Sequence, residues 1–369
     1  MPLDYVGSEW TVDGENKAFF NYEADTRIYD SGKKLTLVYK RNTEDPDAVE
    51  NRLLENDDID GGDAWDALYA ALPDITHFYP TITRVTLQTI DGKLTRTVTE
   101  DTDEIRHYLS VPQSLSHIPT VPITELEKLG GLLGMDVDCV RLQGEIYAFK
   151  KTGEDAEGTL RELTILDTLS FSPSIVPLRA IIVNEDNLIR GFIMPFMLPG
   201  DIDSIFRSIE RDRGSMEGSN AAPVFDWSVI HAWARQISRG VADLHNISAY
   251  NGDIKLQNIL LTPTGEAKLI DFLPMGISDE FAAPEVLEVS KNSHHITLDT
   301  LLTAPADVYS LGLVLWAIAE EKWRVERPPV WRNSRIPQWY IELVERCVVL
   351  NPEVRPSIQE ICSCLDRET

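Results

Sequence analysis

The chain has 369 residues, of which 43% are hydrophobic and 25% charged, and its formal net charge at pH 7 is -26. This length suffices for one large domain or two ordinary ones, and the hydrophobic fraction is too high for general disorder. The negative charge disfavours partners that require a basic face, so we expect no contact with nucleic-acid backbones and none with anionic membranes.

The cysteines and the N-terminal residues indicate the compartment. None of the four cysteines has C-x-x-C spacing, which predicts free thiols in a reducing environment. The first residues are acidic and lack the apolar stretch of a signal peptide, and no run approaches the roughly 18 apolar residues of a membrane span. We therefore expect an intracellular protein, cytoplasmic or nuclear, whose oligomeric state the sequence does not indicate.

Residues 1–115 predict a small α+β or β-rich module. Alternating side chains predict one hairpin from strands 26–29 and 34–39. A second hairpin is predicted from strands 82–90 and 93–98, which flank the turn sequence Asp-Gly. The sequence leaves two roles open for this module, a regulatory or docking domain and an extension packed on the main domain.

The chain from residue 116 onward predicts hairpins followed by helices. A tight hairpin around Gln143-Gly144 ends in Lys150, and a helix over 158–169 carries Glu162. Another hairpin is predicted over 181–197. The apolar stripe over 226–245 predicts a long helix that packs in the core.

The stretch 250–261 predicts a strand-loop-strand unit that carries chemically capable side chains. Asp253 can accept a proton or orient a hydroxyl, Lys255 can stabilise a transferring phosphoryl group, and Asn258 can hold a metal ion. A second apolar strand follows and ends in the carboxylate of Asp271.

These residues resemble the H-R-D-x-x-x-x-N and D-F-G motifs of the eukaryotic-type protein kinases. Further segments resemble other motifs of that family: Tyr147–Lys150 its V-A-I-K strand, Ala283–Glu285 its A-P-E, Asp307–Gly312 its D-x-W-S-x-G, and Asn351–Pro356 its N-P-x-x-R-P. The resemblance implies a bilobal α+β kinase fold with a β-rich N-lobe over 116–197 and a helical C-lobe over 198–369. It also implies an ion pair between Glu285 and Arg355.

The resemblance further implies ATP and Mg²⁺ as cofactors and a protein as the substrate. Asp253 and Lys255 are expected to be catalytic, and Asn258 and Asp271 to bind the metal ion. The residues expected to contact the nucleotide are Gly131, Gly134, Ala148, Lys150, Glu162, Pro195, Met197 and Leu260. The D-I-K-x-x-N form of the catalytic loop resembles the Ser/Thr-directed members of the family.

Several positions depart from the family pattern. Asn251 and Gly252 replace the His and Arg before the catalytic Asp, and Leu273 replaces the Gly after Asp-Phe. Because Gly252 removes the arginine that would bind a phosphorylated activation loop, we expect no such phosphorylation switch.

The glycine loop at 129–134 allows two registers. Gly131 and Gly134 are the last two glycines of the pattern in one register. In the other, Val140 is the strand valine after the loop, only Gly134 is retained, and Asp136 and Asp138 face the phosphates.

Three functions remain open from the sequence. The first is phosphoryl transfer from ATP to Ser/Thr hydroxyls of a protein. The alternative is a pseudokinase that acts as a nucleotide-binding or scaffolding module. A third is a small-molecule kinase, because N-G-D-x-x-x-x-N also resembles the loop of aminoglycoside-type phosphotransferases; the A-P-E, D-x-W-S-x-G and N-P-x-x-R-P segments argue against it.

Overall fold

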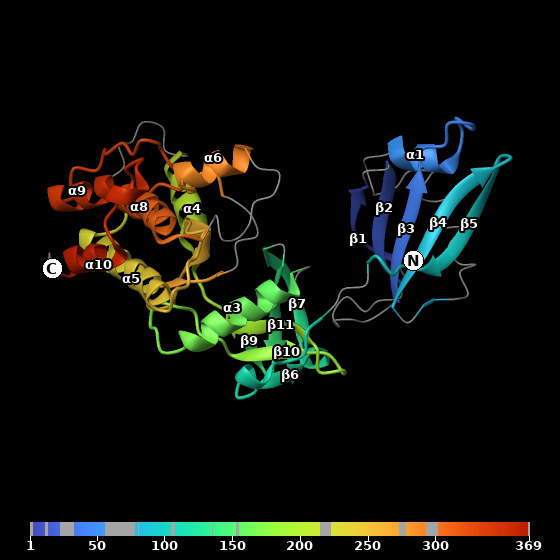
Figure 1. Ribbon diagram of the computed structural model, residues 1–369, viewed down its shortest axis with the longest axis horizontal. Helices are drawn as coiled ribbons and strands as arrows, with labels where there is room; N and C mark the ends of the chain where they lie inside the picture. The colour runs from blue at the N-terminus through green and yellow to red at the C-terminus, as the bar shows by residue number, and fades with distance from the viewer. Residues whose placement is uncertain are drawn as a thin grey trace.

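The computed structural model describes most of the chain. Figure 1 shows, in chain order, an N-terminal sheet, a second sheet and a group of helices. The described residues are 3–11, 14–22, 33–55, 78–79, 81–104, 108–134, 136–152, 155–214, 223–272, 278–292 and 302–367.

The N-terminal part forms a five-stranded sheet of order β1-β2-β3-β4-β5. Its elements are β1 (Leu3–Trp10), β2 (Glu15–Tyr22), β3 (Lys33–Lys40), α1 (Val49–Glu55), β4 (Ile82–Ile90) and β5 (Lys93–Glu100). Strands β3 and β4 are parallel and the other neighbours are antiparallel. The sheet has its own apolar core, built on Phe20, Leu35, Leu37 and Val85. Among the residues that the structure describes, this core includes none from the kinase motifs.

One predicted N-terminal hairpin is confirmed and the other has a different partner. Strands β4 and β5 pair across Asp91 and Gly92, whose φ angles of 52° and 70° are those of a tight primed turn. The predicted strand 34–39 lies in β3, but β3 pairs with β2 on one edge and β4 on the other. The segment 26–29 lies outside the described residues. The predicted pairing is wrong because β2 and β4 already occupy both edges of β3.

The second sheet is six-stranded, of order β6-β10-β11-β9-β8-β7. Its strands are β6 (Thr120–Pro122), β7 (Glu127–Gly134), β8 (Val137–Leu142), β9 (Glu145–Lys151), β10 (Ala180–Val183) and β11 (Ile189–Pro195). The predicted hairpins β8–β9 and β10–β11 both form. Helix α3 (Ala156–Thr168) begins where the side chain of Asp155 accepts the N–H of Gly158 at 2.7 Å.

The remaining chain is largely helical, which confirms the predicted bilobal kinase fold. Its helices are α4 (Ile202–Gly214), α5 (Trp227–Asn246), α6 (Pro284–Asn292), α8 (Ala304–Glu320), α9 (Gln338–Cys347) and α10 (Ile358–Arg367). Helix α8 is largely apolar and buried from Ala306 to Glu320, and α5 and α9 pack against it. A small sheet joins β12 (Gly200–Asp201), β13 (Ile259–Leu261) and β14 (Ala267–Leu269).

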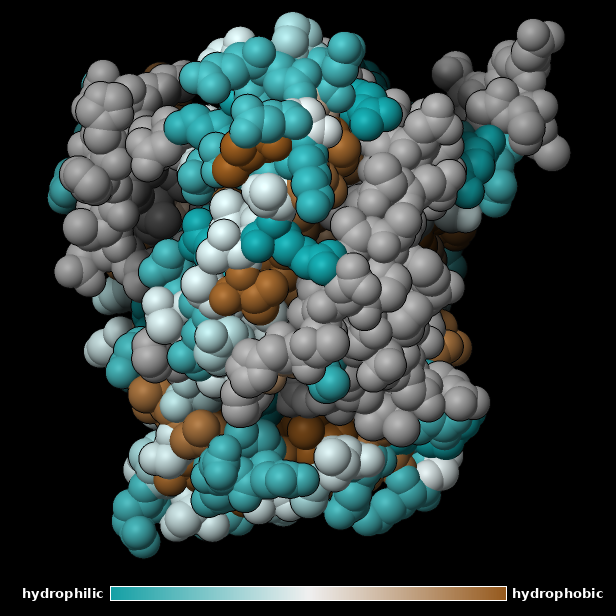
Figure 2. Space-filling model, turned by 90° about the vertical axis from the view of Figure 1, so that its right-hand side faces the viewer, coloured by the Kyte–Doolittle hydropathy of each residue, from teal (hydrophilic) through white to brown (hydrophobic). Residues whose placement is uncertain are grey.

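The outer surface agrees with the strongly acidic composition. On the face in Figure 2 the coloured residues are mainly hydrophilic, and hydrophobic ones form small separate patches. Within the described ranges, no helix is both long and apolar enough to cross a membrane. The division of the chain at residue 115 stays a prediction.

Candidate active site

Asp307 fixes the loop that carries the candidate catalytic residues. This aspartate lies in the first turn of α8 with 1% of its surface exposed. Its carboxylate accepts the backbone N–H groups of Asn251 at 2.9 Å and Gly252 at 2.8 Å, and it contacts the His245 ring nitrogen at 2.9 Å. We did not predict this role of Asp307, although an acidic residue at the start of a largely apolar helix could have indicated it. The predicted strand before Asp253 is wrong, since irregular backbone leads to a 3₁₀ turn over Leu256–Asn258.

Asn251 links the two segments that carry the candidate carboxylates. Its side chain is buried, its Nδ2 donates to the carbonyl oxygen of Asp271 at 3.0 Å, and its Oδ1 accepts the N–H of Asp253 at 2.9 Å. An amide can make both bonds at once because it carries a donor and an acceptor. Gly252, at φ 74°, occupies the left-handed region that favours glycine.

Asp253, Lys255 and Asn258 lie close together and form hydrogen bonds with one another. The Lys255 Nζ donates to Asp253 Oδ2 at 2.5 Å, and the Asn258 Nδ2 donates to the Asp253 carbonyl oxygen at 2.9 Å. The other carboxylate oxygen of Asp253, Oδ1, is buried and accepts no hydrogen bond from the described part of the chain. Burial raises the pKa of Asp253 above its ordinary value, although Lys255 opposes that shift.

Lys150 joins β9 to both α3 and the segment after β14. Its Nζ lies 2.8 Å from Glu162 and 2.8 Å from Asp271, and Oε1 of Glu162 also accepts the N–H of Phe272 at 3.1 Å. Burial opposes the charge of Lys150, but the two carboxylates outweigh it and hold its pKa above the ordinary value. Burial likewise raises the pKa of Glu162, against the effect of Lys150.

The register of β8, β9 and β11 shows which side chains lie on the same face of the sheet as Lys150. Cys139 and Met194 lie opposite Ala148, and Val137 lies opposite Lys150, so these side chains line one face.

Val140, which pairs with Tyr147, packs on the opposite face of the sheet. It therefore does not share the face of Lys150, and the choice between the two glycine-loop registers stays a prediction. Gly131 and Gly134 lie in β7, and Gly134 is paired with Val137.

The expected repulsion between Asp138 and phosphates is also corrected. Asp138 pairs with Phe149 and so points away from the face of Lys150. Its carboxylate is 1% exposed and lies 3.5 Å from Lys151 and 3.8 Å from Lys128. Successive side chains of a strand point to opposite faces, so Asp138 lies on the face opposite to Val137 and Lys150.

Residues 195–199 connect the end of β11 to β12, the first strand of the small sheet in the C-lobe. Pro195 is the last residue of β11 and pairs with Tyr147 beside Ala148. Met197 is buried, and Leu260 in β13 lies opposite Asp201 in β12. The predicted nucleotide residues of both lobes thus lie along the junction between them.

Two side chains, Lys255 and Arg327, hold residues 278–280, which end the stretch between Asp271 and the A-P-E motif that we call the activation segment. Ser278 Oγ accepts a hydrogen bond from Lys255 at 2.9 Å. Arg327, from the loop after α8, donates to the carbonyl oxygens of Asp279 at 2.9 Å and Glu280 at 3.0 Å. Neither contact was visible in the sequence, because each joins residues distant in the chain.

The predicted ion pair between Glu285 and Arg355 is confirmed. Two nearly parallel hydrogen bonds of 2.6 and 2.8 Å join the guanidinium to the carboxylate. The side chain of Arg355 is 1% exposed and also donates to the carbonyl of Pro305 at 2.8 Å. This pair ties the start of α6 to the segment before α10.

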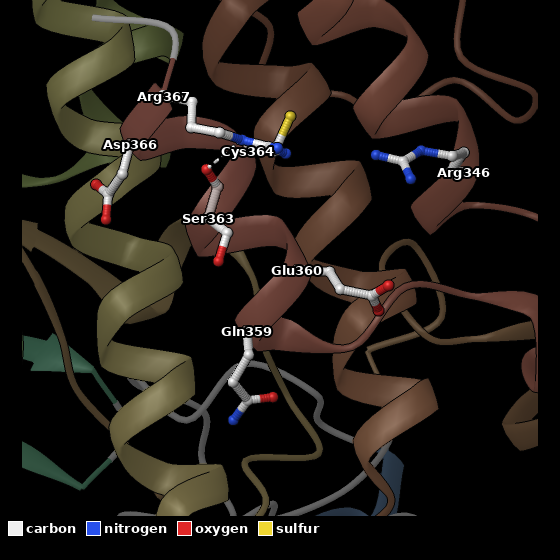
Figure 3. A pocket seen from close by; sticks show the side chains of 7 residues that line it. All are labelled: Arg346, Gln359, Glu360, Ser363, Cys364, Asp366 and Arg367. Carbon is white, nitrogen blue, oxygen red and sulfur yellow. Dashed lines mark hydrogen bonds between the residues drawn. The ribbon is translucent and has the colours of Figure 1, made fainter.

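A separate hollow lies on the C-terminal helices. It measures about 570 Å³ and is lined by Arg346, Gln359, Glu360, Ser363, Cys364, Asp366 and Arg367. Figure 3 shows these side chains on α9 and α10, some turned away from one another. None of the candidate catalytic residues lines it, so it is no part of the site described above.

Comparison with known proteins identifies the family. The family model for the protein kinase domain matches residues 123–364, which is more than half of the chain. The chain therefore belongs to the eukaryotic-type protein kinase family. The match covers both lobes and every candidate catalytic residue.

Relatives of this chain include several kinases at modest identity. It is 27% identical over 288 residues to the MAP kinase kinase skh1/pek1 of Schizosaccharomyces pombe. The aligned region covers 70% of this chain and 74% of the relative. It is 27% identical over 229 residues to the serine/threonine-protein kinase dst4 of Dictyostelium discoideum, covering 57% of this chain and 42% of dst4.

A probable LIM domain-containing serine/threonine-protein kinase of Dictyostelium discoideum is 29% identical over 162 residues, 36% of this chain and 23% of that relative. The chain thus spans less than two thirds of this relative and of dst4. The kinase domain and these relatives support protein phosphorylation as the class of reaction.

Proposed function

We propose that this protein is an active serine/threonine kinase that transfers the γ-phosphoryl group of ATP, with Mg²⁺, to a hydroxyl of a protein substrate. The observation that carries the proposal is the assembled site. Lys150 already lies 2.8 Å from both Glu162 and Asp271. The catalytic loop presents a buried carboxylate oxygen, Asp253 Oδ1, that accepts no hydrogen bond within the described residues.

The donor set suits Mg²⁺, which prefers oxygen ligands. Asp271 supplies a carboxylate. Asn258 uses its Nδ2 to bind the carbonyl of Asp253, which leaves its amide oxygen as the coordinating group. When bound, the metal ion would neutralise charge on the transferring phosphates, and Lys150 would hold the α- and β-phosphates.

The catalytic loop provides for both ends of the transfer. The bond between the γ-phosphorus and its bridging oxygen breaks, a bond to the substrate hydroxyl forms, and ADP leaves. Asp253 Oδ1 orients the hydroxyl and accepts its proton, while Lys255 stabilises the charge on the phosphoryl group. The raised pKa of Asp253 makes its carboxylate a stronger base than that of an ordinary aspartate.

Asn251 supports activity in spite of its departure from the family pattern. It bonds to both Asp253 and Asp271 from a buried position, so it aligns the two carboxylates relative to each other. Because Asp138 faces away from Lys150, the nucleotide side of the sheet lacks the repulsion expected from that residue. Both features favour an active kinase over a pseudokinase.

An ATP-transfer assay tests the proposal. Purified chain is incubated with γ-labelled ATP and Mg²⁺, together with myelin basic protein or casein, and the labelled residue is identified by phosphoamino-acid analysis. Asp253→Asn is expected to lower kcat about 100-fold or more, the scale of a lost general base. Asp226→Asn is the matched control, because Asp226 is exposed and its side chain makes no capping bond to α5.

Other outcomes identify the alternatives. Nucleotide-dependent thermal stabilisation without any transfer would contradict the proposal and identify a nucleotide-binding pseudokinase. Label that appears only on added aminoglycosides or other small alcohols would identify a small-molecule kinase. Label on tyrosine alone would refute the serine/threonine assignment.

A further inference from the structure

The segment between the N-terminal sheet and the family-matched region, residues 108–122, runs along the edge of the kinase sheet; we call it the linker segment. The carbonyl of Leu109 accepts the N–H of Ile189 at 2.8 Å, and Ser110 forms an isolated bridge with Leu188. Its last residues form β6, which pairs in parallel with β10 (Figure 1). The linker segment is therefore part of the kinase lobe rather than a free tether.

Its apolar side chains enter the main kinase core. Leu115 is 1% exposed and Ile118 8% exposed. Both belong to the same buried cluster as Leu163 and Leu166 of α3. Burial of this order contributes roughly 1.5–3 kcal/mol per large aliphatic side chain, so the linker segment is held firmly in the core that also buries one face of α3.

A polar contact fixes the linker segment to the last turns of α3. The His117 Nε2 lies 2.8 Å from Asp167 Oδ1. Since the His117 side chain is 61% exposed, the pair adds little energy, but it sets the position of the segment along the helix.

Helix α3 carries Glu162, the partner of Lys150. Glu162 precedes Leu163 directly, so any shift of the apolar face of α3 moves the carboxylate relative to Lys150. The same carboxylate accepts the N–H of Phe272, so the placement of α3 also reaches the candidate metal-binding segment.

We propose that the linker segment is an intramolecular clamp that positions α3, and through it Glu162, at Lys150. Leu115 and Ile118 are then positioning residues that act without contacting ATP. The activity readout rests on the proposed kinase function, whereas the exchange readout below does not. The clamp gives the N-terminal sheet a physical route to the active site, because the linker segment joins the two.

Leu115→Ala in the full chain tests the clamp. We expect faster amide hydrogen exchange across residues 156–168 and a rise in the KM for ATP of about 2- to 30-fold, the range of coupling through packed elements. Leu343→Ala is the matched control, because Leu343 is also fully buried, at 0% exposed, but lies in α9 instead of the linker segment. Leu115→Met, which conserves volume, should restore both readouts.

Ile118→Val covers the case in which Leu115→Ala does not fold, with Ile361→Val of α10 as its control. Faster exchange confined to α3 and to β10, the strand that pairs with β6, supports the clamp, even if wild type transfers no phosphate. The clamp is refuted if the melting temperature falls by the same amount in the linker and control variants, while the exchange rates in α3 and the KM for ATP stay at their wild-type values.

Discussion

Glu162→Gln gives the sharpest test of the assembled site. Glu162 is 2% exposed and makes two bonds, one to Lys150 at 2.8 Å and one to the N–H of Phe272 at 3.1 Å. A glutamine oxygen can still accept from Phe272, so the substitution removes the charge and leaves the backbone contact. Lys150 then keeps Asp271 as its carboxylate partner and is drawn toward it.

The magnitude follows from the lost charged bond. A hydrogen bond to a charged group contributes about 1.5–3 kcal/mol, and each 1.4 kcal/mol is a factor of about ten in rate. We therefore expect kcat/KM for ATP to fall about 10- to 100-fold. The raised pKa of Glu162 means that its ionised form costs folding free energy, and an uncharged glutamine removes that cost. This gain offsets part of the lost bond to Lys150, so the free energy of unfolding should change far less than the activity.

The assay is initial-rate phosphorylation over a range of ATP concentrations, with nucleotide-induced thermal shift as a second readout. Glu157→Gln is the matched control, since Glu157 lies exposed in the same helix. If Glu162→Gln and Glu157→Gln gave the same kcat/KM and the same thermal shift, the ion pair would have no role in nucleotide handling and the reasoning would fail.

Three further substitutions have defined outcomes. Asp253→Asn should raise the melting temperature at neutral pH, because the raised pKa of Asp253 means that its ionised form costs stability there. The gain should vanish as the pH falls through that pKa and the carboxyl becomes protonated. A gain that stayed constant with pH would contradict this. Arg327→Ala should raise the KM for protein substrate and spare the KM for ATP, unlike exposed Arg335→Ala. Gly191→Ala should lose about 1–3 kcal/mol in urea unfolding, since its Cβ would lie 2.1 Å from the Lys150 carbonyl oxygen, whereas Gly265→Ala, with open space around it, should lose less.

The sequence predicted those parts of the fold that rest on local patterns. The hairpin around Gln143-Gly144 forms because both residues adopt positive φ, at 51° and 89°. Long helix α5 follows its apolar stripe. The predicted partners Glu285 and Arg355 meet because the motifs that carry them have fixed places in the family fold. Local chemistry and family resemblance pointed to the same answer in these cases.

Contacts between distant segments were not predictable in the same way. Strand β3 has two possible neighbours by pattern, and the sheet uses β2 and β4. Asp138 looked harmful beside the glycine loop, but the period of two along a strand turns it from the nucleotide side. Arg327 sits in a loop without periodicity, so nothing in the sequence connects it to the activation segment.

Asn251 shows how a departure from a motif can preserve its geometry. The position demands one donor, to the carbonyl of Asp271, and one acceptor, for the N–H of Asp253. A neutral imidazole offers one of each, but a protonated imidazole offers only donors, whereas an amide offers both at any pH. The alignment of Asp253 with Asp271 therefore does not depend on the titration of residue 251. The pH dependence of transfer should then be governed by the carboxyl of Asp253 itself.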